Sequence, residues 1–380
     1  MAAGQRPVRS GIRTTEHVPS GREARQRPRH ARILPLAERQ PLLKQTTPLL
    51  LPPISFASTM RQYCLPLLLL CGCTTFSNEE SKRLADAQHF ATTYFEGGKL
   101  GQTLIQVERG LDIDPDDYKL NALKGSVLLR ISLLNNKKLD EATEILERVY
   151  TWRSPMRHEP YELFYLGLAR QKQGLRHLGE AIRVEDRARR AADKKKHAEF
   201  VEQSKTERVA ANDQLTNAME VFDVLIERGE RLRLTHNHRM QVARQLGDND
   251  KFLESAEQFF KISKKEQDFV RGEIERTPTA DYEAAQLVAL RELEHEELDV
   301  RALVADYHFH RKDFKTALEH IDRALRLDPT RSDNYYNRGR LHIELANTED
   351  AKKDFRRFLA TSQLPASDSR MTYATKALMR

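Results

Sequence analysis

Cysteine is almost absent from this chain of 380 residues, which has only Cys64, Cys71 and Cys73. No cysteine occurs in the 307 residues that follow, so the bulk of the chain has no internal disulfide, and a Cys-x-Cys pair is too small for a four-ligand zinc site. Gly-rich phosphate loops, nucleophile elbows and His-Glu-x-x-His sequences are also absent. The sequence therefore indicates no enzyme and no cofactor.

Positive charge is concentrated at the start of the chain. Residues 1–59 hold ten Lys or Arg against three Glu, a net charge of +7 that equals that of the whole chain. The same stretch has eight of the fifteen prolines, no hydrophobic period and no aromatic residues interleaved for base stacking. We interpret it as a disordered basic leader and expect no nucleic-acid partner.

A short apolar segment follows, Met-Arg-Gln-Tyr-Cys-Leu-Pro-Leu-Leu-Leu-Leu-Cys-Gly-Cys, from Met60 to Cys73. It has one positive residue and is too short to span a bilayer as a helix. It resembles a bacterial lipoprotein signal peptide, whose lipobox asks for Leu, a small residue, Gly or Ala, and the Cys that is lipidated; Leu70, Gly72 and Cys73 match. The alternative is a buried apolar strand or helix with clustered cysteines.

This resemblance implies a signal peptide at residues 60–72 and acyl chains on Cys73 that anchor the protein to a membrane. Thr74 behind the cysteine is similar to lipoproteins of the outer membrane, facing the periplasm. A signal must stand at the N-terminus, so we expect translation to begin at Met60 and residues 1–59 to be a gene-start error. In the alternative, the leader is real, Cys73 is a free thiol and the protein is cytoplasmic.

Two segments carry a repeat with a period of 34 residues. Near the C-terminus its first copy holds Val304, Ala305, Phe314, Ala317, Ile321, Ala324, Asp328 and Pro329, and the second holds Gly339, Ala351, Phe355 and Phe358. The same frame fits Ala91, Tyr94, Gly98, Leu100, Val107, Gly110, Asp114 and Pro115, with Gly125 one period after Ala91.

The repeat resembles the tetratricopeptide repeat (TPR), a pair of packed helices. In that frame Ala91, Gly125, Ala305 and Gly339 lie where the two helices meet, and a larger side chain would push them apart. Each Asp-Pro pair ends a second helix, because proline disfavours helix for the residue before it. The resemblance implies an all-α fold, a TPR-type solenoid of helical hairpins with long charged helices in the middle.

The expected organisation follows from where the motif is strong. We predict a tether at 73–83, N-terminal repeats at 84–177, long charged helices at 178–235, C-terminal repeats at 236–365, and a tail or capping helix at 366–380. Degenerate copies are indicated by Gly167 and by Ala243, Leu246, Phe252, Ser255, Phe259 and Ile262. The charged middle is interpreted as a solvated helical arm, with coiled-coil dimerisation as the alternative, and the acidic run at 291–298 as a solvated helix face.

TPR arrays bind extended or helical peptides on a concave face lined by the first helix of each pair. In the present frame this face includes Phe95, Lys119, Arg130, Asp306, Phe309, His310, Tyr336, Asn337, Arg340 and Glu344, with Gln88, Thr92, Glu96, Ser126 and Leu129. The mixture of aromatics and both charges suits a protein or peptide ligand. Ser126 replaces the Asn of a carboxylate clamp, so we do not predict a chaperone C-terminus as the ligand.

No metal site is expected. The two histidine clusters, His236 with His238 and His308 with His310, place residues two apart on a helix, where the side chains point away from each other. Together these features predict a non-catalytic scaffold of the bacterial cell envelope, held by a lipidated Cys73. The alternative is a cytoplasmic TPR adaptor with a basic leader.

Overall fold

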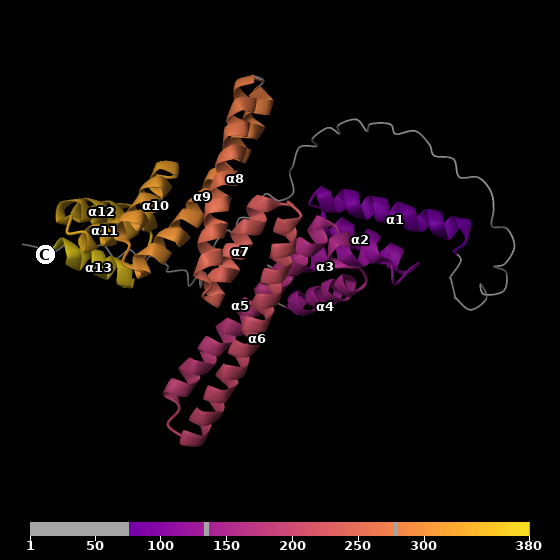
Figure 1. Cartoon of the computed structure of the whole chain (residues 1–380), viewed down its shortest axis with the longest axis horizontal. Helices are drawn as coiled ribbons and strands as arrows, with labels where there is room; N and C mark the ends of the chain where they lie inside the picture. The colour runs from indigo at the N-terminus through magenta and orange to yellow at the C-terminus, as the bar shows by residue number, and fades with distance from the viewer. Residues whose placement is uncertain (1–75, 133–136, 277–279, 380) are drawn as a thin grey trace, which may run out of the picture. The chain divides into compact units, whose positions relative to one another are not determined.

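The described part of the chain consists of helices. The computed structural model describes residues 76–132, 137–276 and 280–379, which hold thirteen α-helices, one 3-10 helix and no strand (Figure 1). All described residues belong to one compact unit. The predicted leader, the signal peptide at 60–72 and Cys73 lie outside the described residues. The all-α prediction is confirmed.

The helices follow one another as antiparallel pairs. The pairs are α1 (Asn78–Glu96) with α2 (Leu100–Leu111), α3 (Tyr118–Ser132) with α4 (Lys137–Thr151), α5 (Pro160–Arg190) with α6 (Lys194–Glu227), α7 (Leu232–Leu246) with α8 (Asn249–Arg276), α9 (Ala280–His310) with α10 (Phe314–Leu327), and α11 (Ser332–Glu344) with α12 (Thr348–Thr361). A 3-10 helix, η1 (Pro155–Arg157), precedes α5, and α13 (Ser369–Leu378) packs on α12. Each pair contacts the next, and α1, α3, α5 and α7 also contact one another in sequence. This is the predicted TPR-type solenoid of helical hairpins.

Small residues set the crossing points, as the repeat predicts. A Cβ atom added to Gly125 on α3 would lie 2.7 Å from Cγ of Leu146 on α4, and one added to Gly339 on α11 would lie 2.8 Å from Cε1 of Phe355 on α12. Such distances are below any normal carbon contact. Only glycine therefore allows these helices to approach as they do.

Helix ends are specified locally. Ser77 and Glu80 form a capping box, so α1 begins at Asn78, inside the tether predicted at 73–83. At the other end, Asp368 caps α13, so the segment predicted as a tail or capping helix is a helix in which Ala374 is buried. Helices α2 and α10 end just before the two Asp-Pro sequences, as expected.

Helices α5 and α6 form the long charged hairpin predicted for the middle of the chain, although α5 begins at Pro160, well before residue 178. Their shared seam is lined by buried small residues spaced seven apart, namely Gly167, Gly174, Ala181 and Ala188 on α5 and Ser204, Ala211 and Ala218 on α6. A seven-residue period keeps one seam facing its partner over many turns. The seam that a coiled-coil dimer would use is thus buried within one chain.

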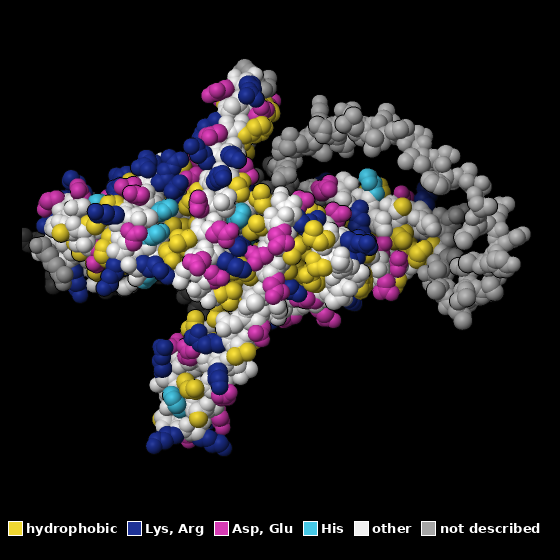
Figure 2. Space-filling model, viewed as in Figure 1, with side chains coloured by type: hydrophobic (Ala, Val, Ile, Leu, Met, Phe, Trp, Pro, Cys, Tyr) yellow, Lys and Arg dark blue, Asp and Glu magenta, His cyan; other side chains and the backbone are white. Residues whose placement is uncertain are grey.

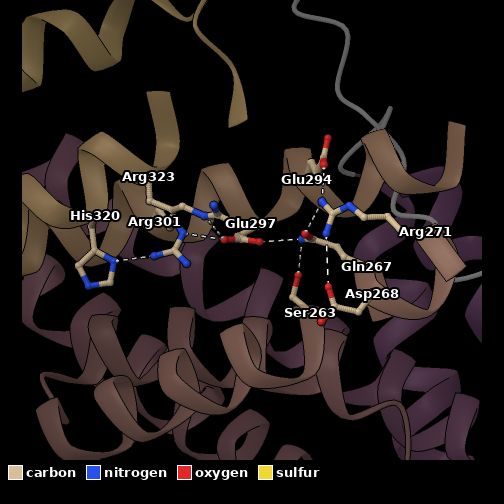
Figure 3. A network of polar contacts seen from close by, with 9 residues as sticks. All are labelled: Ser263, Gln267, Asp268, Arg271, Glu294, Glu297, Arg301, His320 and Arg323. Atoms are coloured by element: carbon tan, nitrogen blue, oxygen red, sulfur yellow. Dashed lines mark hydrogen bonds and ion pairs between the residues drawn. The ribbon is translucent and has the colours of Figure 1, made fainter. Parts of the chain in front are cut away.

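Helices α8 and α9 are a second long, adjacent pair, of 28 and 31 residues, which the division into repeats at 236–365 did not predict. Their seam includes apolar contacts, such as Phe252 with Tyr307, and a polar section in which Ser263, Gln267 and Glu297 are all buried. Hydrogen bonds link these side chains from α8 across to α9 (Figure 3). Buried polar groups hold together when each finds a partner, and here the partners lie within the seam.

Glu297 is the centre of that network. One carboxylate oxygen accepts from Nε of Arg301 at 2.7 Å and lies 3.6 Å from Nε of Arg323, and the other accepts from Nε2 of Gln267 at 2.6 Å (Figure 3). Burial alone would raise the pKa of Glu297, but the hydrogen bonds from Arg301 and Gln267 outweigh it and the pKa is lowered. Since Glu297 is 3% exposed, the interpretation of 291–298 as a solvated face is wrong at this position.

The outer faces carry interspersed acidic and basic side chains (Figure 2). Many form pairs one helical turn apart, such as Lys138 with Glu141 and Lys353 with Asp350. Exposed pairs of this kind contribute at most about 1 kcal/mol each. They indicate ordinary solvated surface, so a site has to be sought where side chains from several helices converge.

Candidate partner-binding surface

The first helices of three successive pairs, α5, α7 and α9, meet the inner side of α6 at a cleft of about 270 Å³. Its apolar lining is Leu175, Leu215, Val242 and Leu303, and its polar lining is Gln171, Gln241, Arg244, Gln245 and Asp299. Pockets that bury a whole small-molecule ligand measure roughly 300–1,000 Å³. This cleft is at the lower limit and suits one or two side chains of a peptide better than a cofactor.

The amides on the cleft wall are oriented by hydrogen bonds. Nε2 of Gln171 donates to Oε1 of Gln241 at 3.2 Å, and Nδ1 of His238 lies 2.9 Å from Oε1 of Gln171. Burial, and next the positive charge of Lys172, lower the pKa of His238 to about 4, so the ring is neutral near pH 7 and Nδ1 carries the donated proton. The two amides are thereby held in one orientation beside the apolar floor.

An ion pair joins this cleft to the C-terminal residues predicted from the repeat. The Arg244 guanidinium on α7 lies 2.5 Å from Oδ2 of Asp306 on α9, and both side chains are about two-fifths exposed. His310, one turn further along α9, lies 3.4 Å from the other oxygen of Asp306 and is exposed. Asp306 and His310 therefore lie at the surface, next to an arginine that the repeat frame does not single out.

Three more predicted residues converge beyond Asp306. The Arg340 guanidinium on α11 lies 4.3 Å from the ring centre of Phe309 on α9 and 5.9 Å from that of Tyr336. Within the described residues Arg340 forms no ion pair. Aromatic faces hold a guanidinium while leaving its edge available for a carboxylate or carbonyl. The remaining predicted residues of α11 are half-buried Asn337 and exposed Glu344.

The binding residues predicted in the first two helical pairs are less available to a ligand than those of α9 and α11. Phe95 is only 8% exposed, its ring contacts Tyr161 and Tyr165 of α5, and the Arg130 guanidinium lies 5.6 Å from it. Because Phe95 is buried, it has no surface that a ligand could contact. Its side chain packs α1 against α3 and α5. Lys119 is exposed.

The other N-terminal positions of the frame are also mostly engaged. Ser126 and Leu129 are buried, and Gln88 donates to Asp117 at 2.6 Å. Thr92 is half-buried and Glu96 is exposed. The first two helical pairs thus present few of the expected binding contacts.

The histidine clusters lie apart from any set of metal ligands. His236 is buried in α7, and His308 pairs with Asp313 at 3.1 Å. Among the residues that the structure describes, no three His, Cys, Asp or Glu side chains come together. Within the same residues, no helix is long and apolar enough to cross a bilayer.

Residues 332–362, which comprise α11 and α12, match the family model of the tetratricopeptide repeat. No curated protein matches the chain. Solved structures that are similar include a tetratricopeptide repeat protein from Parabacteroides merdae, with 14% identity, a TM-score of 0.35, and coverage of 79% of this chain and 100% of that one. The nuclear import adaptor Nro1 of S. pombe is similar with 10% identity, a TM-score of 0.44, and coverage of 79% and 99%.

Proposed function

We propose that this chain, which carries a tetratricopeptide repeat at residues 332–362, is a non-catalytic scaffold that binds a segment of another protein. The observation that carries the proposal is the continuous line of side chains from the cleft between α5, α7 and α9, through the Arg244–Asp306 pair, to Arg340 on α11. Stacked helical repeats commonly bind extended ligands along such a line.

The side chains along this line indicate the chemistry of the ligand. The cleft offers an apolar floor with fixed amides at its wall, which suits an apolar side chain whose neighbouring peptide groups pair with Gln171 and Gln241. Arg340 offers guanidinium donors held between two rings, which suits a carboxylate. The proposed ligand is therefore a peptide segment with an apolar residue followed or preceded by an acidic one.

We also propose that the scaffold is anchored in the bacterial cell envelope by acyl chains on Cys73. The support is the lipobox sequence Leu-Cys-Gly-Cys together with the confinement of all cysteines to residues 64–73. One acyl chain binds membranes weakly, so stable anchoring requires more than one. Helix α1 begins five residues after Cys73, so its start would lie within about 18 Å of the anchor.

Photo-crosslinking tests the binding surface. A photoreactive amino acid at Gln245, in the cleft, is expected to give a covalent adduct in cells, whereas the same residue at exposed Lys265 on α8 gives none. Once the adduct is identified, Arg340→Gln should weaken its binding about tenfold or more, because arginine is enriched among the interface residues whose truncation costs about 1 kcal/mol or more. The matched control, Arg356→Gln, removes an exposed arginine of α12 and should change nothing. Equal adducts at both positions would rule out the cleft.

Intact-mass spectrometry with membrane fractionation tests the anchor. Expressed from its own gene, the protein is expected as a chain beginning at Cys73 with added acyl mass, in the membrane fraction, and Cys73→Ala should abolish both. A soluble, unmodified, full-length chain would contradict the anchor and support the cytoplasmic adaptor with its basic leader. The crosslinking result is independent of this outcome.

A further inference from the structure

The tip of the α5–α6 hairpin concentrates positive charge. Between residues 187 and 197 there are six Lys or Arg and one acid, Asp193. We call the six exposed cations the basic tip; they are Arg187, Arg189, Arg190, Lys194, Lys195 and Lys196. Figure 2 shows these dark blue side chains at the free end of the hairpin.

Local structure gives no reason for this charge. Basic residues in the last turn of α5 agree with the helix dipole, but Lys194, Lys195 and Lys196 occupy the first turn of α6, where cations oppose it and repel each other. Asp193 accepts from the backbone N–H groups of Lys195 and Lys196 at 2.8 and 2.9 Å and so caps the helix despite them. Unfavourable charge at a helix terminus that no packing contact offsets is typical of a functional site.

Four of the six cations are available to a ligand. Arg187 pairs with Glu180 at 2.6 Å and Arg189 with Asp186 at 3.3 Å. Arg190 and the three lysines form no ion pair within the described residues. The other long hairpin does not share this charge, since the adjoining ends of α8 and α9 carry four acids (Glu273, Glu275, Asp281 and Glu283) against Arg271 and Arg276.

The arrangement of charge identifies the shape of the ligand. Along its flanks the hairpin has acidic side chains, Glu180, Glu185 and Asp186 on α5 and Glu199, Glu202 and Glu207 on α6, several of them paired with Arg or His. A ligand lying lengthwise would meet both signs of charge. A broad anionic surface that meets the hairpin end-on would meet six cations and one acid, Asp193, whose carboxylate already accepts from the backbone of α6. The tip has no exposed Phe, Tyr or Trp for stacking on bases.

We propose that the basic tip binds the anionic headgroup layer of a phospholipid membrane. Each Lys or Arg near such a layer strengthens binding about fivefold at moderate salt, and the attraction is confined to about one Debye length, roughly 8–10 Å. Because the four unpaired cations lie at the end of a hairpin, they can approach a membrane to within this distance. The proposal does not depend on acylation of Cys73.

Vesicle sedimentation of the full chain tests the proposal, in the Cys73→Ala background so that no acyl chain contributes. The vesicles are phosphatidylcholine with 30% phosphatidylglycerol, compared with phosphatidylcholine alone. The variant Lys194→Gln/Lys195→Gln/Lys196→Gln should bind the anionic vesicles about 100-fold more weakly, at about fivefold for each charge. The matched control Lys261→Gln/Lys264→Gln/Lys265→Gln removes three exposed lysines of α8 and should bind as the parent does.

Other outcomes overturn the proposal. Equal binding by the tip variant and the parent would assign any attraction to residues 1–59 or to general charge, and equal binding to neutral vesicles would exclude headgroup recognition. Duplex DNA is the competing ligand: tighter binding to DNA than to anionic vesicles, lost in the tip variant, would make the partner a nucleic acid. Unchanged helical circular dichroism in both triple variants establishes that the fold is intact.

Discussion

Two of the three glycines of α5, Gly174 and Gly179, allow a direct test of how closely α5 and α6 pack. A Cβ atom at Gly174 would lie 2.7 Å from Cγ of Leu215 and 3.2 Å from the backbone oxygen of Ala211, whereas nothing lies within 4 Å of a Cβ at Gly179. Both positions are inside the same helix. Alanine substitution therefore has the same effect on helix propensity at both and a different effect on packing.

The two substitutions are expected to change the free energy of unfolding in opposite directions. Replacing glycine by alanine inside a helix stabilises by about 0.5–1 kcal/mol, so Gly179→Ala should raise the free energy of unfolding by that amount. Extra volume in a well-packed seam costs about 1–3 kcal/mol. Gly174→Ala should therefore lower the free energy of unfolding by about 1 kcal/mol net, and the two variants should differ by about 2 kcal/mol.

Urea unfolding followed by circular dichroism at 222 nm measures the difference, with hydrogen exchange of α5 and α6 amides to localise it, because repeat arrays need not unfold in one step. Adding Leu215→Ala to Gly174→Ala removes the atom that the new methyl group meets. The double variant should be more stable than the sum of the two single changes predicts, by about 1 kcal/mol. If Gly174→Ala proves as stable as Gly179→Ala, the described approach of the two helices is refuted.

Two further predictions concern buried polar groups. Burial is the largest cause that lowers the pKa of His238 and of His320 to about 4, below the ordinary value of 6.5. As the pH falls, these histidines take up protons in the unfolded chain before they do so in the folded protein, so the free energy of unfolding decreases between pH 6.5 and 4. At pH 5 each histidine should lower the free energy of unfolding by about 2 kcal/mol. His238→Gln should therefore reduce the pH dependence of urea unfolding. Glu297→Ala should lower the free energy of unfolding by about 3 kcal/mol because it leaves the charge of Arg301 uncompensated. The control Glu294→Ala, at a half-buried position, should lower it by less than about 1 kcal/mol. Equal effects of the two substitutions would contradict the role of burial.

The short repeats were predictable because a few residues determine their geometry. Gly125 and Gly339 allow helices to cross where any other side chain would collide, and the Asp-Pro sequences after α2 and α10 end helices through backbone constraints. These constraints are local and recur at a fixed period. The sequence therefore indicated the short helical pairs, whereas the binding role of Phe309, Tyr336 and Arg340 stays a prediction.

The long helices were harder to predict because their seams include small and polar residues among the apolar ones. In α5 the signal was a small residue every seven positions, at Gly167, Gly174, Ala181 and Ala188, which a search for apolar periods does not detect. In α8 and α9 the buried seam includes Gln267 and Glu297, whose burial depends on partners from another helix. Sequence periodicity cannot supply such partners, so the division into repeats at 236–365 does not predict the second long pair.

The cleft was missed for a related reason. It is lined by α5, α6, α7 and α9, and the motif is degenerate in α5 and α7, while the family match covers only α11 and α12. Gly167 nevertheless retains the crossing contact, since a Cβ there would lie 2.6 Å from Cε1 of Phe222, and further packing is carried by seam residues outside the 34-residue frame. The weak repeat signal of α5 and α6 thus marks two helices that are longer than those of the first two pairs and packed by a different rule, and these two helices form the basic tip.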